Sequence, residues 1–352
     1  MSTIAVGAIT DASGGATATI NAYTPTASNM AGRNRIINGD MRIDQRNAGA
    51  AVTPGEGIYT VDRWEAKQTT ASKFSVQQST SSPPVGFINY VRCTSLSAFS
   101  VGSSDQFGLR QIIEGLNHSD FNWGSADAKT ITISFWVRSS LTGTFGCAFY
   151  NYAGDRSYPF TYIISSANTW EKKTVTVAGD TSGTWSTTST AGICLFFSLG
   201  SGSTVSGTAG SWSGSFLASA TGATSVVATS GATFDFTGVQ LEEGSVATPF
   251  EHRSYGTELA LCQRYYQQPI DSGLDFFAGY MVDGYYGPAC FSTWHCEMRA
   301  TPTVVVTLGT LNAVGSVSVN YFDKKRFHLN PTANATSNGF WYLNKLTADA
   351  EL

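Results

Sequence analysis

The sequence predicts an all-β protein, and three features of the chain lead to this prediction. Only 13% of its 352 residues are charged, against the ~25% usual for soluble domains. Glycine, serine, threonine, alanine and asparagine take their place, a mixture that favours turns and strands over helices. Short stretches of alternating apolar and polar residues recur between these turns. The length allows two domains, each with its own core.

Residues 1–33 contain few large apolar side chains, too few to build a core. We interpret this segment as an extended arm that is disordered alone or folds against a partner, whose contacts offset the cost of ordering. A terminus without a function fits the composition equally well. The start lacks the basic and continuous apolar regions of a secretory signal, and no stretch is apolar for ~20 residues. Synthesis in a cytoplasm, without membrane insertion, is expected.

The region 34–253 is predicted to form an antiparallel sandwich of the jelly-roll type. Its strand candidates are separated by Gly, Ser, Thr and Asn turns and show almost no helical period, which favours this architecture. The low-complexity stretch 200–232 is predicted to be a long surface loop or hairpin excursion. The strand candidates are 87–93, 107–113, 130–138, 143–151, 160–164, 171–177, 191–199 and 233–241.

After residue 253 the pattern changes to a helical period. Leu259, Cys262, Tyr265 and Tyr266 recur at three- and four-residue spacing, which predicts a short linking helix over 254–267. Pro249 imposes an extended connector just before it. Alternation then returns and predicts a smaller C-terminal β-sandwich, a tip, over 268–352. Its strand candidates are 276–282, 289–296, 303–308, 314–319, 326–329 and 340–344.

Charge and cysteine content argue against several classes of function. The net charge is −4 and the longest basic run is Lys324-Lys325-Arg326, so the basic face that nucleic-acid binding needs is missing. The six cysteines are dispersed, and we interpret them as buried free thiols. Cys290 and Cys296, with His295 beside them, raise the question of zinc or a disulfide, but a four-ligand site has no second pair at suitable spacing. No metal is predicted there.

No catalytic constellation is recognisable in the sequence. The four histidines are scattered without metal-ligand spacing, and no nucleophile elbow, phosphate-binding loop or dinucleotide fingerprint occurs in a suitable context. Polysaccharide hydrolysis would need two carboxyl groups roughly 5 to 9 Å apart, which a sequence does not show. The chain also lacks the fixed-period repeat of a parallel β-helix. We therefore predict a protein that is not an enzyme.

Several short motifs resemble those of tail-fibre proteins from tailed bacteriophages and prophages. They are NRIINGDM at 34–41, YTVDRW at 59–64, VQLEEG at 239–244, ATPFE at 247–251 and LCQRYYQ at 261–267. The segment AITDASGG at 8–15 looks like a phage fibre attachment segment. The resemblance implies a jelly roll like that of carbohydrate-binding modules followed by a small β-tip, a homotrimer, and a place in the virion tail. The arm would then hold other tail proteins through Ile9, Thr10, Asp11, Asn21 and Tyr23.

Two of these motifs have a physical interpretation of their own. Asp62 and Arg63 beside Trp64 offer a charge-assisted pair against an aromatic face, which more often locks a strand entry than binds a ligand. Gln240, Glu242 and Glu243 follow a buried strand and either cap loops or supply oxygens to a structural Ca²⁺. Calcium needs about six to eight oxygens, so calcium is the minority alternative and no cofactor is otherwise predicted.

Binding of a glycan is the better supported function, because aromatic rings ringed by hydroxyl and amide groups grip sugars. Adjacent residues of a strand point to opposite faces. One of Tyr285 and Tyr286, and one of Trp341 and Tyr342, is therefore expected to face outward or into a subunit interface. These four residues of the tip are the main candidates for receptor contact. Trp185 and Trp212, in loops of the jelly roll, are weaker candidates, because loop tryptophans also plug the ends of sandwiches.

Two hypotheses about function remain open at this stage. In the first, the chain is a tail fibre that binds a host surface polysaccharide or lipopolysaccharide for adsorption. In the second, it is an architectural virion protein, a head decoration or baseplate component, without receptor binding.

Overall fold

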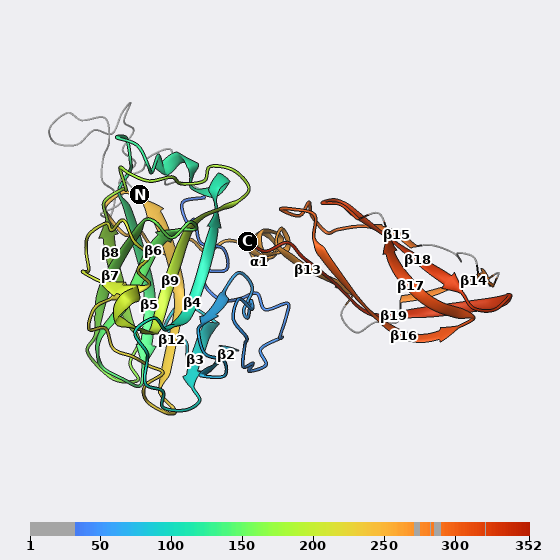
Figure 1. Ribbon diagram of the computed structural model, residues 1–352, viewed down its shortest axis with the longest axis horizontal. Coiled ribbons are helices and arrows are strands. Elements are labelled where there is room, and N and C mark those ends of the chain that lie inside the picture. The colour runs from blue at the N-terminus through green and yellow to red at the C-terminus, as the bar shows by residue number, and fades with distance from the viewer. Residues whose placement is uncertain (1–31, 271–274, 282, 285–289, 321) are drawn as a thin grey trace, which may run out of the picture.

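The computed structural model describes residues 32–352 except 271–274, 282, 285–289 and 321. The described chain folds into two β units joined by one short helix, α1 (Tyr255–Gln263). Figure 1 shows the second unit extending away from the first. The all-β prediction is therefore confirmed. Some predicted site residues lie outside the described residues: Tyr285 and Tyr286 of the tip, and Ile9, Thr10, Asp11, Asn21 and Tyr23 of the arm.

The first unit is an antiparallel sandwich of two five-stranded sheets. The β12 sheet has the order β2-β3-β12-β5-β8, and the β9 sheet has the order β1-β4-β9-β6-β7. The strands of the β12 sheet are β2 (Phe74–Ser79), β3 (Tyr90–Ser95), β5 (Ile131–Ser139), β8 (Glu171–Val177) and β12 (Thr233–Glu243). Those of the β9 sheet are β1 (Glu65–Gln68), β4 (Gln106–Glu114), β6 (Gly143–Asn151), β7 (Ser157–Ile164) and β9 (Ala191–Ser201). The predicted strands are present, and β1 and β2 are additional.

Alternating side chains of the two sheets meet in one core. Phe234 and Phe236 of β12 point inward on either side of Asp235, as a period of two requires. The ring of Phe236 stacks on that of Phe197 from β9, with centroids 4.4 Å apart. The indole of Trp64 meets Phe236 edge-on at 5.0 Å. The sandwich is thus held by aromatic contacts between strands that are distant in sequence.

The low-complexity stretch is mostly loop and turn, as its composition predicts, and it also covers one face of the sandwich. It contains the short parallel strands β10 (Ser206–Gly207) and β11 (Ser219–Ala220). It packs on the outward face of the β9 sheet, where Ala218 is buried and Phe216 meets Tyr150 edge-on at 5.0 Å. That face carries the apolar side chains of Ile112 and Phe196, so it needs a cover.

Helix α1 is shorter than its period predicts. Ser254 caps it by accepting a hydrogen bond from the backbone N–H of Thr257. The helix ends at Gln263, and Tyr266 already begins strand β13 (Tyr266–Ile270). Tyr266 and Gln267 pair with strand β19 (Ser337–Asp349) near the far end of the chain. This long-range pairing overrides the local helical pattern.

The second unit contains two smaller sheets. One has the order β13-β19-β14, with β16 also paired to β19, and the other has the order β15-β18-β17. The remaining strands are β14 (Asp275–Met281), β15 (Cys290–Thr293), β16 (Thr303–Asn312), β17 (Val314–Asn320) and β18 (Arg326–Ala333). Trp341, Leu343, Leu346 and Ala348 of β19 lie in a core of their own.

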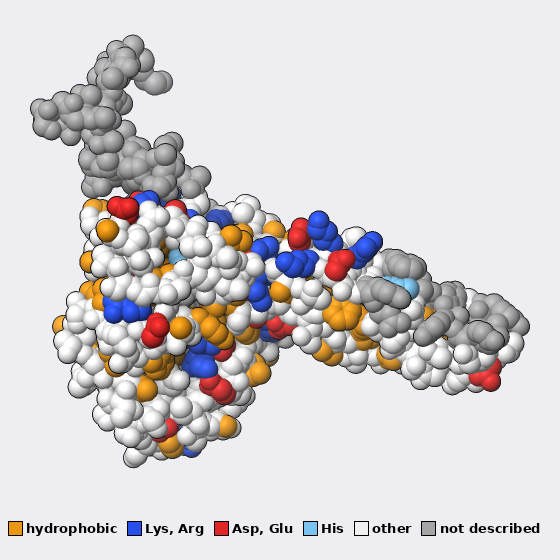
Figure 2. Space-filling model, turned by 45° about the horizontal axis from the view of Figure 1, so that its top comes forward, with side chains coloured by type: hydrophobic (Ala, Val, Ile, Leu, Met, Phe, Trp, Pro, Cys, Tyr) orange, Lys and Arg blue, Asp and Glu red, His pale blue; other side chains and the backbone are white. Residues whose placement is uncertain are grey.

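The end of the chain returns to the first unit. Leu352 packs beside Cys262 and Tyr265 and also against the cluster on the β9 sheet, and Figure 1 shows the C-terminus beside α1. On the face drawn in Figure 2, charged side chains are frequent where the two units meet. Within the described part of the chain, no helix has the length and apolarity needed to cross a membrane.

Candidate functional site

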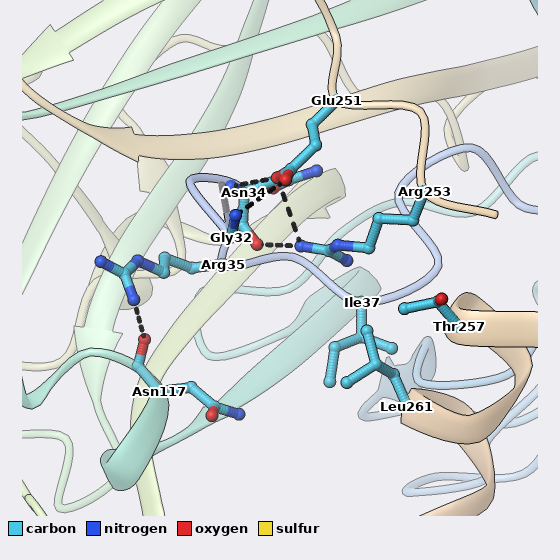
Figure 3. Close-up of a pocket in the computed structure, with 9 residues that line it drawn as sticks. All are labelled: Gly32, Asn34, Arg35, Ile37, Asn117, Glu251, Arg253, Thr257 and Leu261. Carbon is cyan, nitrogen blue, oxygen red and sulfur yellow. Dashed lines mark hydrogen bonds and ion pairs between the residues drawn. The ribbon is translucent and has the colours of Figure 1, made fainter. Parts of the chain in front are cut away.

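A cavity lies beside the first described residues and is called the arm-root cavity. Its volume is about 370 Å³. Figure 3 shows its lining, which comes from the start of the described chain, from the 3₁₀ turn Gly115–Asn117, from the connector before α1 and from α1 itself. The lining residues are Gly32, Asn34, Arg35, Ile37, Asn117, Glu251, Arg253, Thr257 and Leu261.

Three of the sequence motifs line this cavity, through Asn34, Glu251 and Leu261, although Asn34 and Glu251 are 217 residues apart along the chain. The Glu251 carboxylate accepts the backbone N–H groups of Gly32 (2.9 Å) and Asn34 (2.8 Å). The Asn34 side chain donates to the Val239 carbonyl oxygen (3.1 Å) and accepts from the backbone N–H of Leu241 (3.1 Å). The segment around Asn34 and the connector around Glu251 therefore lie side by side. They extend the β12 sheet by an irregular edge that is not one of its five strands.

The charges of the arm-root cavity are paired within the protein. Arg253 donates to the carbonyl oxygens of Asn34 and Ile36 and forms an ion pair with the buried Glu258 at 3.3 Å. Arg35 forms an ion pair with Asp120 at 2.5 Å. A cation that already has its counter-ion contributes little to binding a further anion. We therefore assign this cavity to anchoring residues 32–42 on the jelly roll.

The motif at 59–64 is structural as well, but its charges have other partners than the sequence predicts: Asp62 pairs with Arg46, and Arg63 pairs with Glu351. Asp62 is buried and accepts hydrogen bonds from the backbone and side chain of Gln45. Burial raises the pKa of the Asp62 carboxyl, against the lowering effect of Arg46. The guanidinium of Arg63 lies 3.5 Å from the ring centroid of Tyr265 and forms an ion pair with Glu351. Asp62 and Arg63 thus stabilise the junction between the two units rather than bind a ligand.

Further polar contacts join the two units. Arg264 forms an ion pair with Glu114 of β4 at 2.7 Å, and Tyr265 donates its hydroxyl to the same carboxylate at 2.7 Å. Burial raises the pKa of Tyr265 to about 12. Arg299 of the second unit donates to the carbonyl oxygen of Ser189 at 2.9 Å. The junction is an extended network of buried charge.

A second, smaller cavity lies at one end of the sandwich and is called the aromatic cavity. Its volume is about 170 Å³. Its lining comes from the segment between β4 and β5, which includes the 3₁₀ turn Ser119–Phe121, and from the loop after β8. The lining residues are His118, Ser119, Asn122, Trp123, Ser125, Trp185 and Thr187.

Three indoles support this cavity. Trp123 meets Trp185 edge-on at 4.8 Å and Trp212 edge-on at 5.2 Å. Each indole N–H has an acceptor within the protein, so the rings are held in place: Trp123 donates to Lys129, Trp185 to Asp180 and Ser182, and Trp212 to Ala178. Trp185 is buried and Trp212 is half-buried. The two predicted tryptophans therefore plug the end of the sandwich, and Trp185 at the same time lines a cavity.

The rim of the aromatic cavity is polar and accessible. Ser119, Asn122, Ser125 and Thr187 are all exposed. Within the described chain, no hydrogen bond engages the Asn122 carboxamide or the Thr187 hydroxyl. Asn122 takes a left-handed backbone conformation, with φ of 54°, which asparagine tolerates better than most residues. The rim thus presents donors and acceptors above an aromatic base.

His118 lies at the back of the aromatic cavity. The residue is 2% exposed, and among the described residues its Nε2 atom has no hydrogen-bond partner. Burial lowers the pKa of His118 to about 4. A Cβ atom on Gly192 would collide with this ring, so a glycine there gives the imidazole its space. The ring is held neutral at physiological pH.

The sequence did not point to most of this cavity. Trp123, His118 and the rim residues were not singled out, although the stretch Phe121-Asn122-Trp123-Gly124-Ser125 joins an indole to turn-forming residues between two strands. That stretch is the available signal. Only the fold brings it next to Trp185.

The structure corrects one predicted contact residue of the tip. Trp341 has no exposed surface and lies in the second core, because its position on β19 points inward with Leu343. It is therefore not a surface contact in this arrangement. Tyr342, on the opposite face of the strand, is half-buried and meets Phe340 edge-on at 5.5 Å. One member of the pair faces inward and the other outward, as the alternation predicts.

The oxygens proposed for calcium have partners inside the protein. Glu242 accepts the backbone N–H (2.9 Å) and hydroxyl (2.6 Å) of Thr248. Gln240 donates to Glu242 at 2.9 Å, and Glu243 pairs with Lys129 at 3.0 Å. Among the described residues, no group of three or more His, Cys, Asp or Glu side chains is placed to hold a metal ion. Glu242 thus orders the connector before α1, whereas Glu243 pairs with Lys129 from the segment before β5.

Comparisons with known proteins give only weak likenesses. No family model matches the chain, and no curated protein matches it. Three of the similar solved structures are the enzymatically active domain of bacteriophage CBA120 tailspike protein 4, a family 61 carbohydrate-binding module in complex with β-1,4-galactotriose, and a family 11 carbohydrate-binding module of a Clostridium thermocellum cellulase.

The likenesses cover similar shares of this chain. The tailspike domain is 11% identical with a TM-score of 0.32, over 60% of this chain and 21% of the tailspike chain. The family 61 module is 12% identical with a TM-score of 0.32, over 60% and 99%. The family 11 module is 10% identical with a TM-score of 0.29, over 58% and 100%. The chain thus spans about a fifth of the tailspike domain, and scores this low carry no argument about its fold or function.

Proposed function

We propose that this chain is a receptor-binding tail fibre of a tailed bacteriophage, which binds a glycan on the host surface. The aromatic cavity is the observation that carries the proposal. Fixed indoles of Trp123 and Trp185 lie under a rim of uncharged hydroxyl and amide groups. Sugars present apolar ring faces together with equatorial hydroxyls, and such a surface matches both.

The phage part of the proposal rests on the motif resemblance. The motifs at 34–41, 59–64, 239–251 and 261–267 all contribute to the arm root and the junction. A segment that must transmit force between an anchored arm and a projecting tip needs such a rigid base. In a homotrimer, three weak glycan sites would gain avidity by binding one surface together.

The second candidate is an architectural virion protein without receptor binding. The same junction favours it, because the motifs contact one another rather than an open site. In that case the aromatic cavity would only close the end of the sandwich.

The test is binding of the fluorescently labelled full chain to intact bacteria from a panel of strains, with and without competing surface polysaccharide. We expect saturable, competed binding to at least one strain. Thr187→Trp places an indole over the aromatic cavity from an exposed position and should weaken binding at least tenfold. Thr257→Trp places the same side chain in the arm-root cavity, also from an exposed position, and should bind like the wild type.

The possible results separate the candidates. Absence of saturable binding to every strain, by a chain shown to be folded, would favour the architectural candidate. Equal binding by wild type and Thr187→Trp would show that any recognition surface lies elsewhere.

A further inference from the structure

We infer that the aromatic cavity selects a single uncharged sugar ring and rejects uronic, sialic and phosphorylated sugars. The inference rests on the proposed function and adds the chemical class of the ligand. It is carried by the lining of the cavity, by the charges around its rim and by its size.

The lining contains no cation. Of its seven residues, the four at the rim carry hydroxyl or amide groups and two are tryptophans. The seventh, His118, is neutral at physiological pH because burial lowers its pKa to about 4. A carboxylate or phosphate entering the cavity would lose hydration without gaining an ion pair, which is costly. Hydroxyl groups of a neutral sugar would instead meet the Asn122 carboxamide and the Thr187 hydroxyl.

Charges of both signs lie near the rim. Arg299 is half-buried and donates to the carbonyl oxygens of Ser189, Ala350 and Glu351. Asp127 is exposed and lies two residues after Ser125. Asp120 follows Ser119 in the same 3₁₀ turn, and its charge is compensated by Arg35. Beneath the indoles, Asp180 is buried and compensated by Arg156 at 2.5 Å. Asp127 is therefore an exposed negative charge close in sequence to the rim residue Ser125, and such a charge repels an anion within a screening length of ~8 to 10 Å.

The arm-root cavity does not offer an alternative anion site. It has two arginines, but Arg253 is paired with Glu258 and Arg35 with Asp120. An acidic sugar would have to displace an existing ion pair there. Among the residues that line the two cavities, none is therefore a cation without a carboxylate partner.

The size of the aromatic cavity indicates one ring. Cavities that hold drug-sized ligands measure roughly 300 to 1,000 Å³, and this one measures about 170 Å³. We therefore expect it to hold one residue at a chain end or branch, with the rest of the glycan outside.

The experiment changes the charge of the ligand while keeping its backbone. Surface polysaccharide extracted from a bacterial strain of the panel is tested as a competitor in two forms, with its primary alcohols intact and after their oxidation to carboxylates. A third sample, reduced back to alcohols, controls for chain damage. We expect the alcohol forms to compete and the carboxylate form to compete at least tenfold less well. Binding of the alcohol form should change less than twofold between 50 and 500 mM NaCl.

A variant of the protein tests the same preference for uncharged sugars by changing the charge near the rim. Asp127→Lys reverses the exposed rim charge and should improve competition by the carboxylate form threefold or more, while the alcohol form stays within twofold of wild type. Stronger competition by the carboxylate form on the wild-type protein would overturn the inference and leave glycan binding intact. Failure of both forms to compete would instead overturn the proposed function.

Discussion

The arm-root cavity and the aromatic cavity differ in how their polar groups are used. The arm-root cavity is the larger, and its arginines and glutamate are joined to buried partners and backbone groups. The aromatic cavity is smaller and uncharged, and its rim keeps Asn122 and Thr187 available. The motifs that resemble phage fibres build the first cavity and contribute nothing to the second. In this protein the recognisable motifs build structural contacts between segments, whereas the surface suited to a ligand lies in the aromatic cavity.

The largest loss of stability is expected from a substitution in the arm-root cavity, and it tests whether that cavity is structural. Arg253→Ala leaves Glu258 buried without its counter-ion and removes two hydrogen bonds to the segment 34–36. We expect the free energy of unfolding to fall by about 3 to 5 kcal/mol, measured by denaturant titration with tryptophan fluorescence.

The matched control for this change is Lys325→Ala. Lys325 pairs with Glu297 at 3.5 Å on the surface, and its side chain is 70% exposed. Its loss should alter stability by less than ~0.5 kcal/mol. If Arg253→Ala proved as mild as this control, the arm root would not be a structural anchor.

A second, smaller effect is expected from His118 when the pH is lowered. The unfolded ring titrates near 6.5, while burial lowers the pKa of the folded ring to about 4. Between these values only the unfolded state binds the proton, so the stability contributed by the neutral ring is present above pH 6.5 and is lost as the pH falls to 4. The total loss is about 3 kcal/mol.

The control for the pH effect is His118→Asn, which has no titrating group. We expect the stability of wild type to fall more steeply than that of the variant between pH 6.5 and 4, and the two slopes to match above pH 7. Parallel curves across the whole range would mean that folding does not lower the pKa of His118.

The smallest effect concerns a single rim group. Asn122→Gly removes the carboxamide and keeps the left-handed backbone accessible. Loss of one hydrogen bond to a sugar hydroxyl should weaken glycan binding about 2- to 10-fold, measured by competition on cells, with unchanged thermal stability. If Asn122→Gly lowered stability as much as Arg253→Ala, Asn122 would be a structural residue, and the two cavities would not differ in the use of their polar groups.

Local patterns predicted much of the fold. The alternation around Phe234 and Phe236 predicted a half-buried strand, and both rings are buried in β12. The helical spacing of Leu259 and Cys262 predicted α1, but the prediction ran too far because Tyr266 also fits that spacing. Tyr266 instead belongs to a strand, because it pairs with Asp349 of β19. A contact with a residue so far along the chain is invisible to a local pattern.

The candidate site was less accessible to prediction. For Trp341 and Tyr342 the alternation showed that they face opposite ways, but the register of β19 against its neighbours selected Trp341 for the core. In the same way, Trp185 and Trp212 were recognisable as loop tryptophans, while Trp123 became part of their cluster only through packing.

The sequence by itself therefore determined the fold class, the places of most strands and the helix, and the scarcity of charge that argues against nucleic acid. These follow from side-chain periodicity and composition, which act within a few residues. The tertiary structure decided which charges are paired, which indole lines a cavity and how the C-terminus locks the two units. Those outcomes depend on contacts between segments up to about 300 residues apart, such as Arg63 with Glu351, and on the burial that only the assembled sheets create.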